Sequence, residues 1–268
     1  MSMRHFPMLR RVVLIVVCLV VVSGALLAQR GGGRGGPSAL SRTLGVNPPY
    51  DGRFTFTRVS YNRGSGLAGG FSRRGGMSQA WNHDYPRADL NLALILEAIT
   101  AIQPNLDATN ILSLEDPEIF KNPVLYMWEP GYWRITDAEA ENLRKYLLKG
   151  GFIIFDDFEV DHLDNLKEQF RRAMPHAEFI KLDTSHRIFH TFFEMNSINV
   201  PHPTMNVQPA YYAVFEDNDP TRRILALANH NSDIAEYWEW SGQGFLPVYT
   251  TNDAYKLGVN YIIYALTH

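Results

Sequence analysis

Residues 136–157 read TDAEAENLRKYLLKGGFIIFDD, and this stretch decides the fold. Apolar residues recur at helical spacing from Thr136 to Leu148, which predicts an amphipathic helix. Thr136 and Glu139 have the spacing of a capping box at its start. The glycine pair at 150 and 151 predicts its end, because glycine readily adopts the left-handed conformation found after helices.

A strand is predicted directly after this helix, from Phe152 to Phe155, and it ends at Asp156-Asp157. It is apolar at every position, as expected for a strand that is buried on both faces of a sheet. The same alternation continues on both sides, with further strands predicted at 54–61, 124–128, 177–182 and 224–228 and helices at 86–102, 165–174 and 255–266. We therefore expect an α/β protein with a doubly wound, mostly parallel sheet.

The helix predicted at 86–102 has its own start signals. Asp84 can cap it, and Pro86 suits its first turn. Its expected buried face consists of Leu90, Leu94, Ile95 and Ile99.

Composition sets the limits of function. The chain has 268 residues, of which 46% are hydrophobic and 20% charged, so it can bury a sizeable core. This excludes disorder of the whole chain. The formal net charge of −3 offers no basic stripe, so we expect no nucleic-acid partner.

The N-terminus has the features of an export signal. Arg4, Arg10 and Arg11 precede the apolar run 12–22, and small residues follow it. We expect residues 1–28 to be a signal peptide, with cleavage after Ala28 or, alternatively, Ala25, and a periplasmic or secreted protein. An uncleaved segment would instead anchor the chain, and only then is membrane contact expected.

Removal of the signal would also remove Cys18, the only cysteine. The exported chain would then have neither a disulfide nor a thiol nucleophile. Residues 29–50 are rich in glycine and arginine and are interpreted as a flexible linker. Residues 51–268 are interpreted as a single domain, with a glycine-rich loop at 62–79.

Polar residues follow four of the predicted strands. In doubly wound sheets, ligands bind at the carboxyl ends of strands. We therefore expect Glu129, Asp157 and His230 to surround one cleft, with Tyr61 and either Trp128 or Trp238 on its wall. The full set of expected ligand-binding residues is Tyr61, Asn62, Trp128, Asn229, Asp233 and Trp238.

The acidic stretch after residue 155 has two interpretations. Asp156, Asp157 and Glu159 offer oxygen ligands for a hard cation such as Mg²⁺ or Ca²⁺. Alternatively, one aspartate caps the next helix and the others are solvated, because adjacent side chains of a strand point to opposite faces. The second interpretation is favoured, so we expect no metal and no cofactor.

The remaining polar clusters also have a structural alternative. Asn229 to Asp233 could hold a substrate or form a turn that caps a helix. Trp238 could stack on a sugar ring or lie in the core. His186 and His190 have a metal-like spacing but lack the glutamate of an HExxH motif, so zinc is not expected there. His202 lies between two prolines and is expected to be exposed.

Three longer stretches carry a family resemblance: WNHDYPRAD at 81–89, LLKGGFIIFDDF at 147–158 and AYKLGVNYIIYALTH at 254–268. Together they resemble a bacterial family, the domain of unknown function 4159. The resemblance implies a flavodoxin-like three-layer sandwich, similar to class I glutamine amidotransferases and the ThuA group. Those amidotransferases use a cysteine at a strand-to-helix elbow, whereas here the strand 124–128 leads into Glu129. The resemblance therefore implies the fold but not the activity.

Two functions remain open from the sequence, and whether the protein is an enzyme is not decided. One is a module of the cell envelope that binds a sugar-like molecule or a partner protein. The other is a carbohydrate-active hydrolase or lyase, with or without a metal, that uses Glu129, Asp156, Asp157 and His230.

Overall fold

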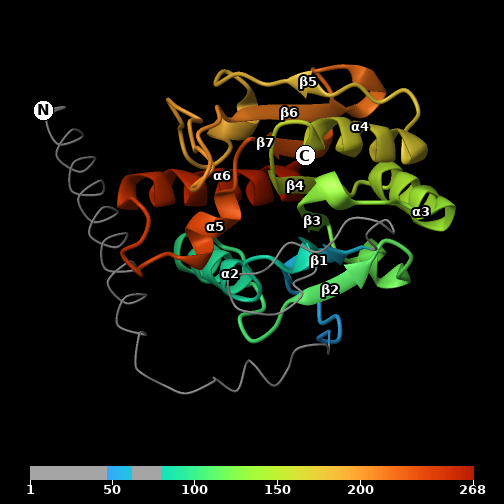
Figure 1. The fold of residues 1–268 in the computed structure, drawn as a ribbon. Coiled ribbons are helices and arrows are strands. Elements are labelled where there is room, and N and C mark those ends of the chain that lie inside the picture. Colours follow the sequence, from blue (N-terminus) through green and yellow to red (C-terminus); the bar gives the residue numbers. More distant parts are fainter. Residues whose placement is uncertain (1–46, 62–79) are drawn as a thin grey trace, which may run out of the picture.

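A computed structural model describes residues 47–61 and 80–268 of the chain (Figure 1). The signal segment, most of the predicted linker, Asn62 and the glycine-rich stretch that follows it lie outside the described residues. The N-terminal predictions therefore stay predictions.

The core of the protein is a seven-stranded sheet with the order β2-β1-β3-β4-β7-β6-β5. The neighbours β2, β1, β3, β4 and β7 run parallel, and β6 is antiparallel to both β7 and β5. The strands are β1 (Thr57–Ser60), β2 (Asn110–Ser113), β3 (Val124–Trp128), β4 (Phe152–Phe158), β5 (Ile180–Lys181), β6 (Ala210–Phe215) and β7 (Ile224–His230). This confirms the prediction of a mostly parallel, doubly wound α/β sheet.

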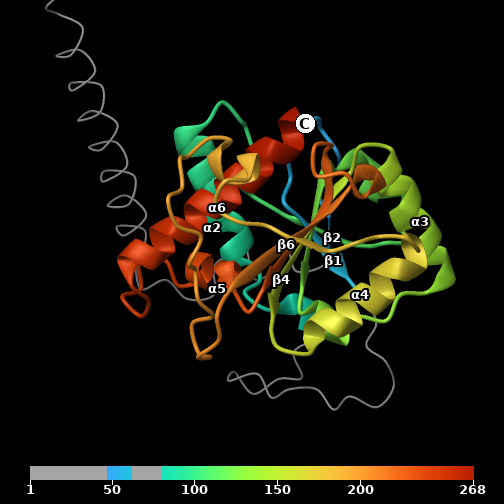
Figure 2. The same cartoon turned by 90° about the horizontal axis from the view of Figure 1, so that it is seen from above.

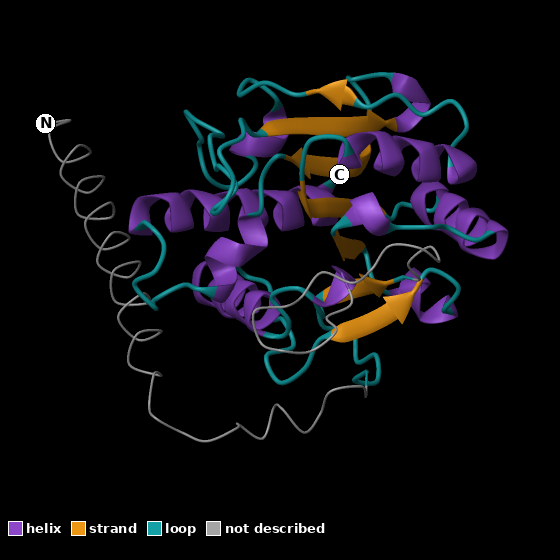
Figure 3. Cartoon of the chain, viewed as in Figure 1, coloured by secondary structure: helices purple, strands orange, loops and turns teal. Residues whose placement is uncertain are grey.

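Helices cover both faces of this sheet, which gives three layers (Figures 2 and 3). One face packs against α2 (Arg87–Ile99), α5 (Ile234–Glu239) and α6 (Val248–Thr267), and the other against α3 (Asp137–Leu148) and α4 (His162–Ala173). Short 3-10 helices lie in the connections: η2 (Ala80–Asn82), η3 (Pro117–Lys121), η4 (Pro130–Tyr132), η5 (Arg187–His190) and η6 (Glu216–Asn218). Among the described residues, no helix is both long and apolar enough to cross a membrane.

The helix-and-strand pair that predicted the fold is present. Thr136 caps α3 by accepting a hydrogen bond from the Glu139 amide, and the Glu139 side chain accepts one from the Thr136 amide. The capping box is therefore confirmed. Gly150 follows the helix with a φ of 107°, a conformation that favours glycine.

The predicted start of α2 is wrong, and its predicted buried face is correct only in part, because Ile95 and Ile99 pack against the core but Leu94 does not. Pro86 occupies the N-cap position without a side-chain hydrogen bond, and the Asp84 carboxylate instead accepts one from Trp128 Nε1 at 2.8 Å. The helix buries Leu92 and Leu96, whereas Leu94 is 47% exposed. The physical reason is tertiary: Asp89 on the same face forms a buried ion pair with Arg58 of β1, which fixes the rotation of α2.

Some elements are longer than predicted and others are shorter. The strand from Phe152 continues to Phe158, and the last helix begins at Val248 instead of Tyr255. The strand predicted at 177–182 is reduced to the two residues of β5. Two strands, β2 and β6, are not predicted, because their short or irregular apolar patterns give little periodic signal. The helix α5 confirms the interpretation of residues 229–233 as a turn that caps a helix.

Candidate functional site

Three side chains meet where β3 and β4 end. His83 follows η2, Glu129 follows β3, and Asp157 lies near the end of β4. The Nδ1 atom of His83 lies 2.8 Å from Glu129 Oε1 and 3.0 Å from Asp157 Oδ2. One histidine nitrogen therefore contacts two carboxylates from different strands.

Unusual backbone conformations position the carboxylates at this end of the sheet. Glu129 and Asp157 adopt left-handed conformations, with φ values of 45° and 56°, and so does Asp84, at 59°. Non-glycine residues rarely adopt this conformation, and such strain persists only where the surrounding structure enforces it. At Asp157 the register between β4 and β7 also shifts, which marks a bulge. Bulges change the direction in which a side chain points.

The bulge gives the adjacent aspartates different surroundings. Asp156 is fully buried and accepts hydrogen bonds from Tyr126 Oη at 2.6 Å, from Asn229 Nδ2 at 2.9 Å and from the amides of Ile234 and Ala235, each at 3.1 Å. Burial raises the pKa of Asp156 to about 6, although the bonds from Tyr126 and Asn229 oppose the rise. Asp156 thus joins β3, β7 and the start of α5, which is a structural role.

Asp157 has a histidine on each of its oxygens. Besides His83 at Oδ2, His202 places Nε2 at 3.7 Å from Oδ1. Burial disfavours the Asp157 anion, but His202 and His83 outweigh that effect and lower the pKa of Asp157 to about 2. Burial likewise opposes protonation of His83, yet Asp157 and Glu129 raise the pKa of His83 to about 11.

His202 was not identified as a site residue, and its predicted exposure is wrong. Its side chain is only 10% exposed. The segment is held by neighbours: Ser232 Oγ donates to the Val200 carbonyl at 2.7 Å, and Tyr237 Oη donates to the Pro201 carbonyl at 2.9 Å. A loop between two prolines is therefore packed against the end of the sheet rather than against solvent.

Further carboxylates surround these groups. Asp233 lies with Asp157 and His202, so that one ligand atom of each lies within 4.8 Å of the others. Asp84 forms a second acidic group with Glu236 and Glu239. Burial, followed by the charge of Asp157, raises the pKa of both Asp84 and Asp233. Such an accumulation of carboxylates favours the binding of protons or cations.

Five of these residues form the strand-end cluster: His83, Glu129, Asp157, His202 and Asp233. The sequence matches the family described as a domain of unknown function, DUF4159, over residues 55–266. The chain belongs to this family. A comparison with curated proteins gives no match. The matched part of the DUF4159 domain contains the whole strand-end cluster.

Several residues that were predicted to bind a ligand instead hold the backbone or the core next to the strand-end cluster of the DUF4159 domain. Tyr61 Oη donates to the carbonyls of Trp128 and Glu129, at 3.0 and 2.6 Å, and so fixes the end of β3. Asn229 is fully buried and bonds to Asp156. Trp128 and Trp238 are also fully buried, so their rings belong to the core rather than to the wall of a cleft.

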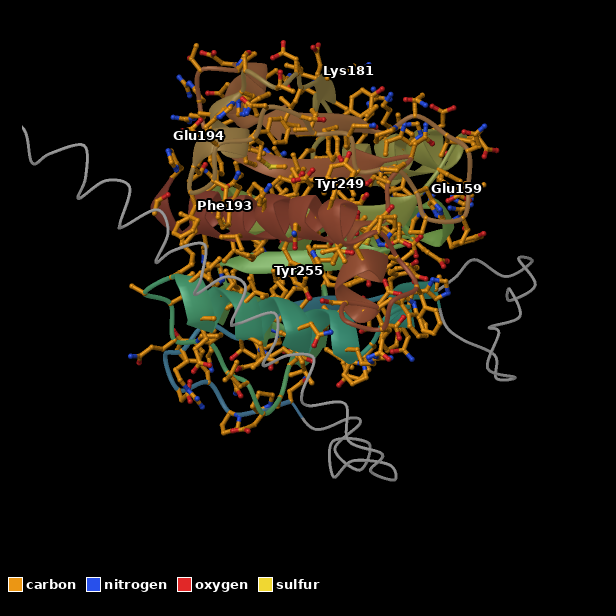
Figure 4. All side chains as sticks on the ribbon, turned by 90° about the vertical axis from the view of Figure 1, so that its left-hand side faces the viewer. Glu159, Lys181, Phe193, Glu194, Tyr249 and Tyr255 are labelled. Atoms are coloured by element: carbon orange, nitrogen blue, oxygen red, sulfur yellow. The ribbon has the colours of Figure 1, made fainter. Side chains whose placement is uncertain are left out.

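His230 and Glu159 have contacts outside the strand-end cluster. The His230 ring packs on Phe158 and Tyr212, and its Nε2 lies 2.9 Å from the Val160 carbonyl oxygen. Phe158 belongs to the face covered by α3 and α4, whereas Asn229 bonds to Asp156 on the opposite face. The Glu159 carboxylate lies 3.6 Å from His162 Nδ1 at the periphery of the domain (Figure 4). His230 and Glu159 therefore have structural partners that do not belong to the strand-end cluster.

Asp233, His186 and His190 of the DUF4159 domain each have local hydrogen-bond partners. Asp233 caps α5 by accepting from the Glu236 amide at 2.9 Å, and it also belongs to the strand-end cluster. His186 and His190 have separate partners: His186 accepts from the Ile188 amide, and His190 contacts Glu194 and the Thr184 carbonyl.

Two residues of the strand-end cluster were missed from the sequence. His83 lies inside the WNHDYPRAD stretch that carries the family resemblance, and this was a signal that could have pointed to it. His202 offered only its position between two prolines. Neither follows a strand, so the rule that ligands bind at strand ends could not find them.

Proposed function

We propose that the DUF4159 domain is a hydrolase that depends on a divalent metal ion held by His83, Glu129 and Asp157. One observation carries the proposal: a single histidine nitrogen lies 2.8 and 3.0 Å from oxygens of two carboxylates that come from separate strands. Histidine nitrogen and carboxylate oxygen are ligands of catalytic metal sites, and three protein ligands leave further coordination positions for water and substrate.

The spacing of these atoms suits a metal after a small adjustment. Metal–nitrogen and metal–oxygen bonds of about 2.0–2.2 Å place the ligand atoms of a tetrahedral site roughly 3.4 Å apart. The three ligand atoms here lie within 4.8 Å of one another. In the absence of a metal, the proton on His83 Nδ1 supplies the positive charge that the two carboxylates require.

The donor types indicate which metals to test. Mixed nitrogen and oxygen ligands favour Zn²⁺, Mn²⁺ or Fe²⁺ over Mg²⁺ and Ca²⁺, which prefer oxygen alone. From the sequence alone no metal is expected, because the sequence does not show that His83 lies beside the carboxylates. The three-dimensional arrangement supplies the nitrogen ligand.

Hydrolysis is the chemistry that this site supports best. A metal of this kind can lower the pKa of a bound water to about 7. It can also stabilise the negative charge that develops on the carbonyl or phosphoryl oxygen of the substrate. The His83 side chain is 43% exposed, so water and a substrate can reach the ligands from that side. Trp128 and Trp238 are buried, so stacking of a sugar on these two rings is not part of the proposal.

Metal analysis of the purified protein tests the proposal first. After treatment with a chelator, the protein is titrated separately with Zn²⁺, Mn²⁺, Mg²⁺ and Ca²⁺, and bound metal is measured by mass spectrometry and calorimetry. The loaded protein is then assayed with chromogenic carboxylic esters, phosphoesters and glycosides. We expect binding of Zn²⁺ or Mn²⁺ and metal-dependent cleavage of one of these bond classes.

Variants link both results to the site. His83→Ala, Glu129→Gln and Asp157→Asn should each weaken metal binding at least about 10-fold. His190→Ala is the matched control, since His190 also contacts a carboxylate, that of Glu194, but outside the cluster. Equal binding by all four variants would contradict the proposal. Metal binding without cleavage of any substrate would support a ligand-binding module instead.

We also propose that the protein is exported. The apolar run 12–22, which follows a cluster of arginines, supports this. The expected mature N-terminus is Gln29, and N-terminal sequencing of the protein from an expressing bacterium checks it. Recovery of the full-length chain from the membrane fraction would instead indicate an anchor.

A further inference from the structure

The two carboxylate oxygens of Asp157 are directed to different histidines. Oδ2 lies 3.0 Å from His83 Nδ1, and Oδ1 lies 3.7 Å from His202 Nε2. The proposed metal uses only the first of these oxygens. A carboxylate that presents one oxygen to each of two ligand sets has the arrangement of a bridge between two metal ions.

Asp157 also belongs to a second group of potential metal ligands. Asp157, His202 and Asp233 each place one ligand atom within 4.8 Å of the others. This set repeats the composition of the first, one histidine and two carboxylates, with Asp157 shared between them. Asp157 and Asp233 are buried, and the His202 side chain is 10% exposed.

Hydrogen bonds hold the segments that carry His202 and Asp233. The segment that carries His202 is fixed through its carbonyls by Ser232 and Tyr237, on either side of Asp233. Asp233 itself is fixed by the Glu236 amide. His202 Nδ1 accepts a hydrogen bond from the Thr204 amide at 3.3 Å and also lies 3.3 Å from Thr204 Oγ1. A metal on Nε2 would require the proton to move to Nδ1, with Thr204 Oγ1 as its hydrogen-bond acceptor.

We propose that the DUF4159 domain binds two divalent metal ions bridged by Asp157, the first on His83 and Glu129 and the second on His202 and Asp233. This inference rests on the proposed function and extends it to a two-metal site. In such sites the ions lie about 3.5–4 Å apart and together stabilise the attacking and leaving oxygens of a hydrolysed bond.

The charge of the cluster can accommodate two ions. Three ligating carboxylates, Glu129, Asp157 and Asp233, lie at the cluster, with Asp84 and Glu236 next to them. One divalent ion balances two of the three ligating carboxylates and leaves the third to be balanced by a proton. Two divalent ions balance the ligating carboxylates and leave positive charge for a hydroxide or an anionic substrate.

The stoichiometry of metal binding tests the inference. We expect the wild-type protein to bind two Mn²⁺ ions per chain, and their magnetic coupling to give the broad electron paramagnetic resonance signal of a close pair. His202→Gln and Asp233→Asn should bind one ion strongly and the other at least about 10-fold more weakly. Asparagine still caps helices, so Asp233→Asn should keep α5 folded.

The variants separate the two proposals. His83→Ala should lose the first ion and keep the second, whereas Asp157→Asn should weaken both. Thermal unfolding of each variant without metal checks that it is folded, and His190→Ala should bind as the wild type does. One ion in the wild type, unaffected by His202→Gln, would overturn the two-metal inference and leave the proposed function standing. Two ions unaffected by His202→Gln would overturn the ligand assignment, and no bound ion would overturn both.

Discussion

At the scale of single residues, Arg58 connects the core to the site. It is fully buried and pairs with Asp89 of α2, and it also donates to the carbonyls of Trp81 and His83. Its guanidinium carbon lies 3.4 Å from the centre of a ring of Trp128, a cation–π contact. The position of the His83 backbone therefore depends on a cation outside the strand-end cluster.

Replacement of Arg58 should strongly destabilise the protein. Arg58→Ala leaves the Asp89 carboxylate buried without its cation, and breaking a buried pair in this way costs about 3–5 kcal/mol. Chemical denaturation measures the change in the free energy of unfolding. Arg53→Ala is the control: it removes an ion pair with Asp51 whose side chains are 45% and 42% exposed, and should cost less than about 1 kcal/mol. Similar losses of unfolding free energy in both variants would show that the buried pair stabilises the protein no more than the exposed pair does.

At the scale of elements, α5 depends on its neighbours rather than on its own length. It has only six residues, fewer than an isolated helix needs for stability. Asp233 and Asp156 accept hydrogen bonds from its first amides, and Trp238 packs it against α6. Since α5 follows Asp233 directly, its packing also positions one ligand of the strand-end cluster.

Packing between α5 and α6 should not tolerate a side chain at Gly258. A Cβ atom there would lie 2.6 Å from Trp238 Cζ2 and 3.1 Å from Leu92 Cδ1. Tyr255, one turn earlier on α6, stacks on the same tryptophan. Gly258→Ala should therefore lose about 1–3 kcal/mol of stability through overpacking, despite the better helix propensity of alanine. Thermal unfolding beside the exposed control Asn252→Ala checks this, and a stabilised Gly258→Ala would contradict it.

The 3-10 helix η5 should respond to acid through His186. The ring accepts a hydrogen bond from the Ile188 amide at 3.2 Å, which requires an unprotonated Nδ1. Burial, followed by the charge of Arg187, lowers the pKa of His186 below 6.5. The unfolded chain therefore takes up the proton first. The stabilisation is fully present above about pH 6.5 and is lost as the pH falls through the folded-state pKa.

His186→Asn keeps a capping side chain that does not titrate. Its melting temperature should fall less steeply than that of the wild type between about pH 7 and 5, and the two curves should run in parallel above about pH 7.5. His176→Asn, at an exposed histidine, should follow the wild type throughout. A steeper fall for His186→Asn would show that the protonated ring stabilises the fold.

At the scale of the whole molecule, the site brings together segments that are spread between residues 83 and 233. His83 precedes α2, Glu129 and Asp157 follow the central strands β3 and β4, and His202 and Asp233 come from segments on either side of β6 and β7. A ligand that binds all five residues would therefore cross-link most of the sheet. Anything that binds the folded state alone stabilises it.

Metal should consequently raise the melting temperature. A metal concentration 100-fold above its dissociation constant stabilises the folded state by about 2.7 kcal/mol. For a domain of this size, that corresponds to a rise of roughly 5–10 °C. Scanning calorimetry with Zn²⁺ or Mn²⁺, and then with excess chelator, measures the rise and its reversal. Asp157→Asn should show little of it, and an equal rise in this variant would place the bound metal elsewhere.

Local signals in the sequence are enough to predict the fold class and several of the helices and strands. The capping box of Thr136 and Glu139 depends on neighbours three residues apart, and the apolar run from Phe152 shows its burial without reference to the rest of the chain. Such signals indicated a parallel sheet covered by helices, and the strand-end rule pointed to Glu129 and Asp157. Their physical causes, side-chain periodicity and hydrogen bonding to nearby amides, act over short distances along the chain.

Only the tertiary structure decided which of these residues share a site. The bulge at Asp157 separates it from Asp156, and the strand order brings it to His83 and His202, which are 74 and 45 positions away in the sequence. Nothing in the local pattern distinguishes the two aspartates, or shows that His230 packs on Phe158 while Asn229 faces Asp156. The reason is that side-chain direction at the end of a strand depends on register and on left-handed backbone conformations, and both are fixed by contacts between distant segments.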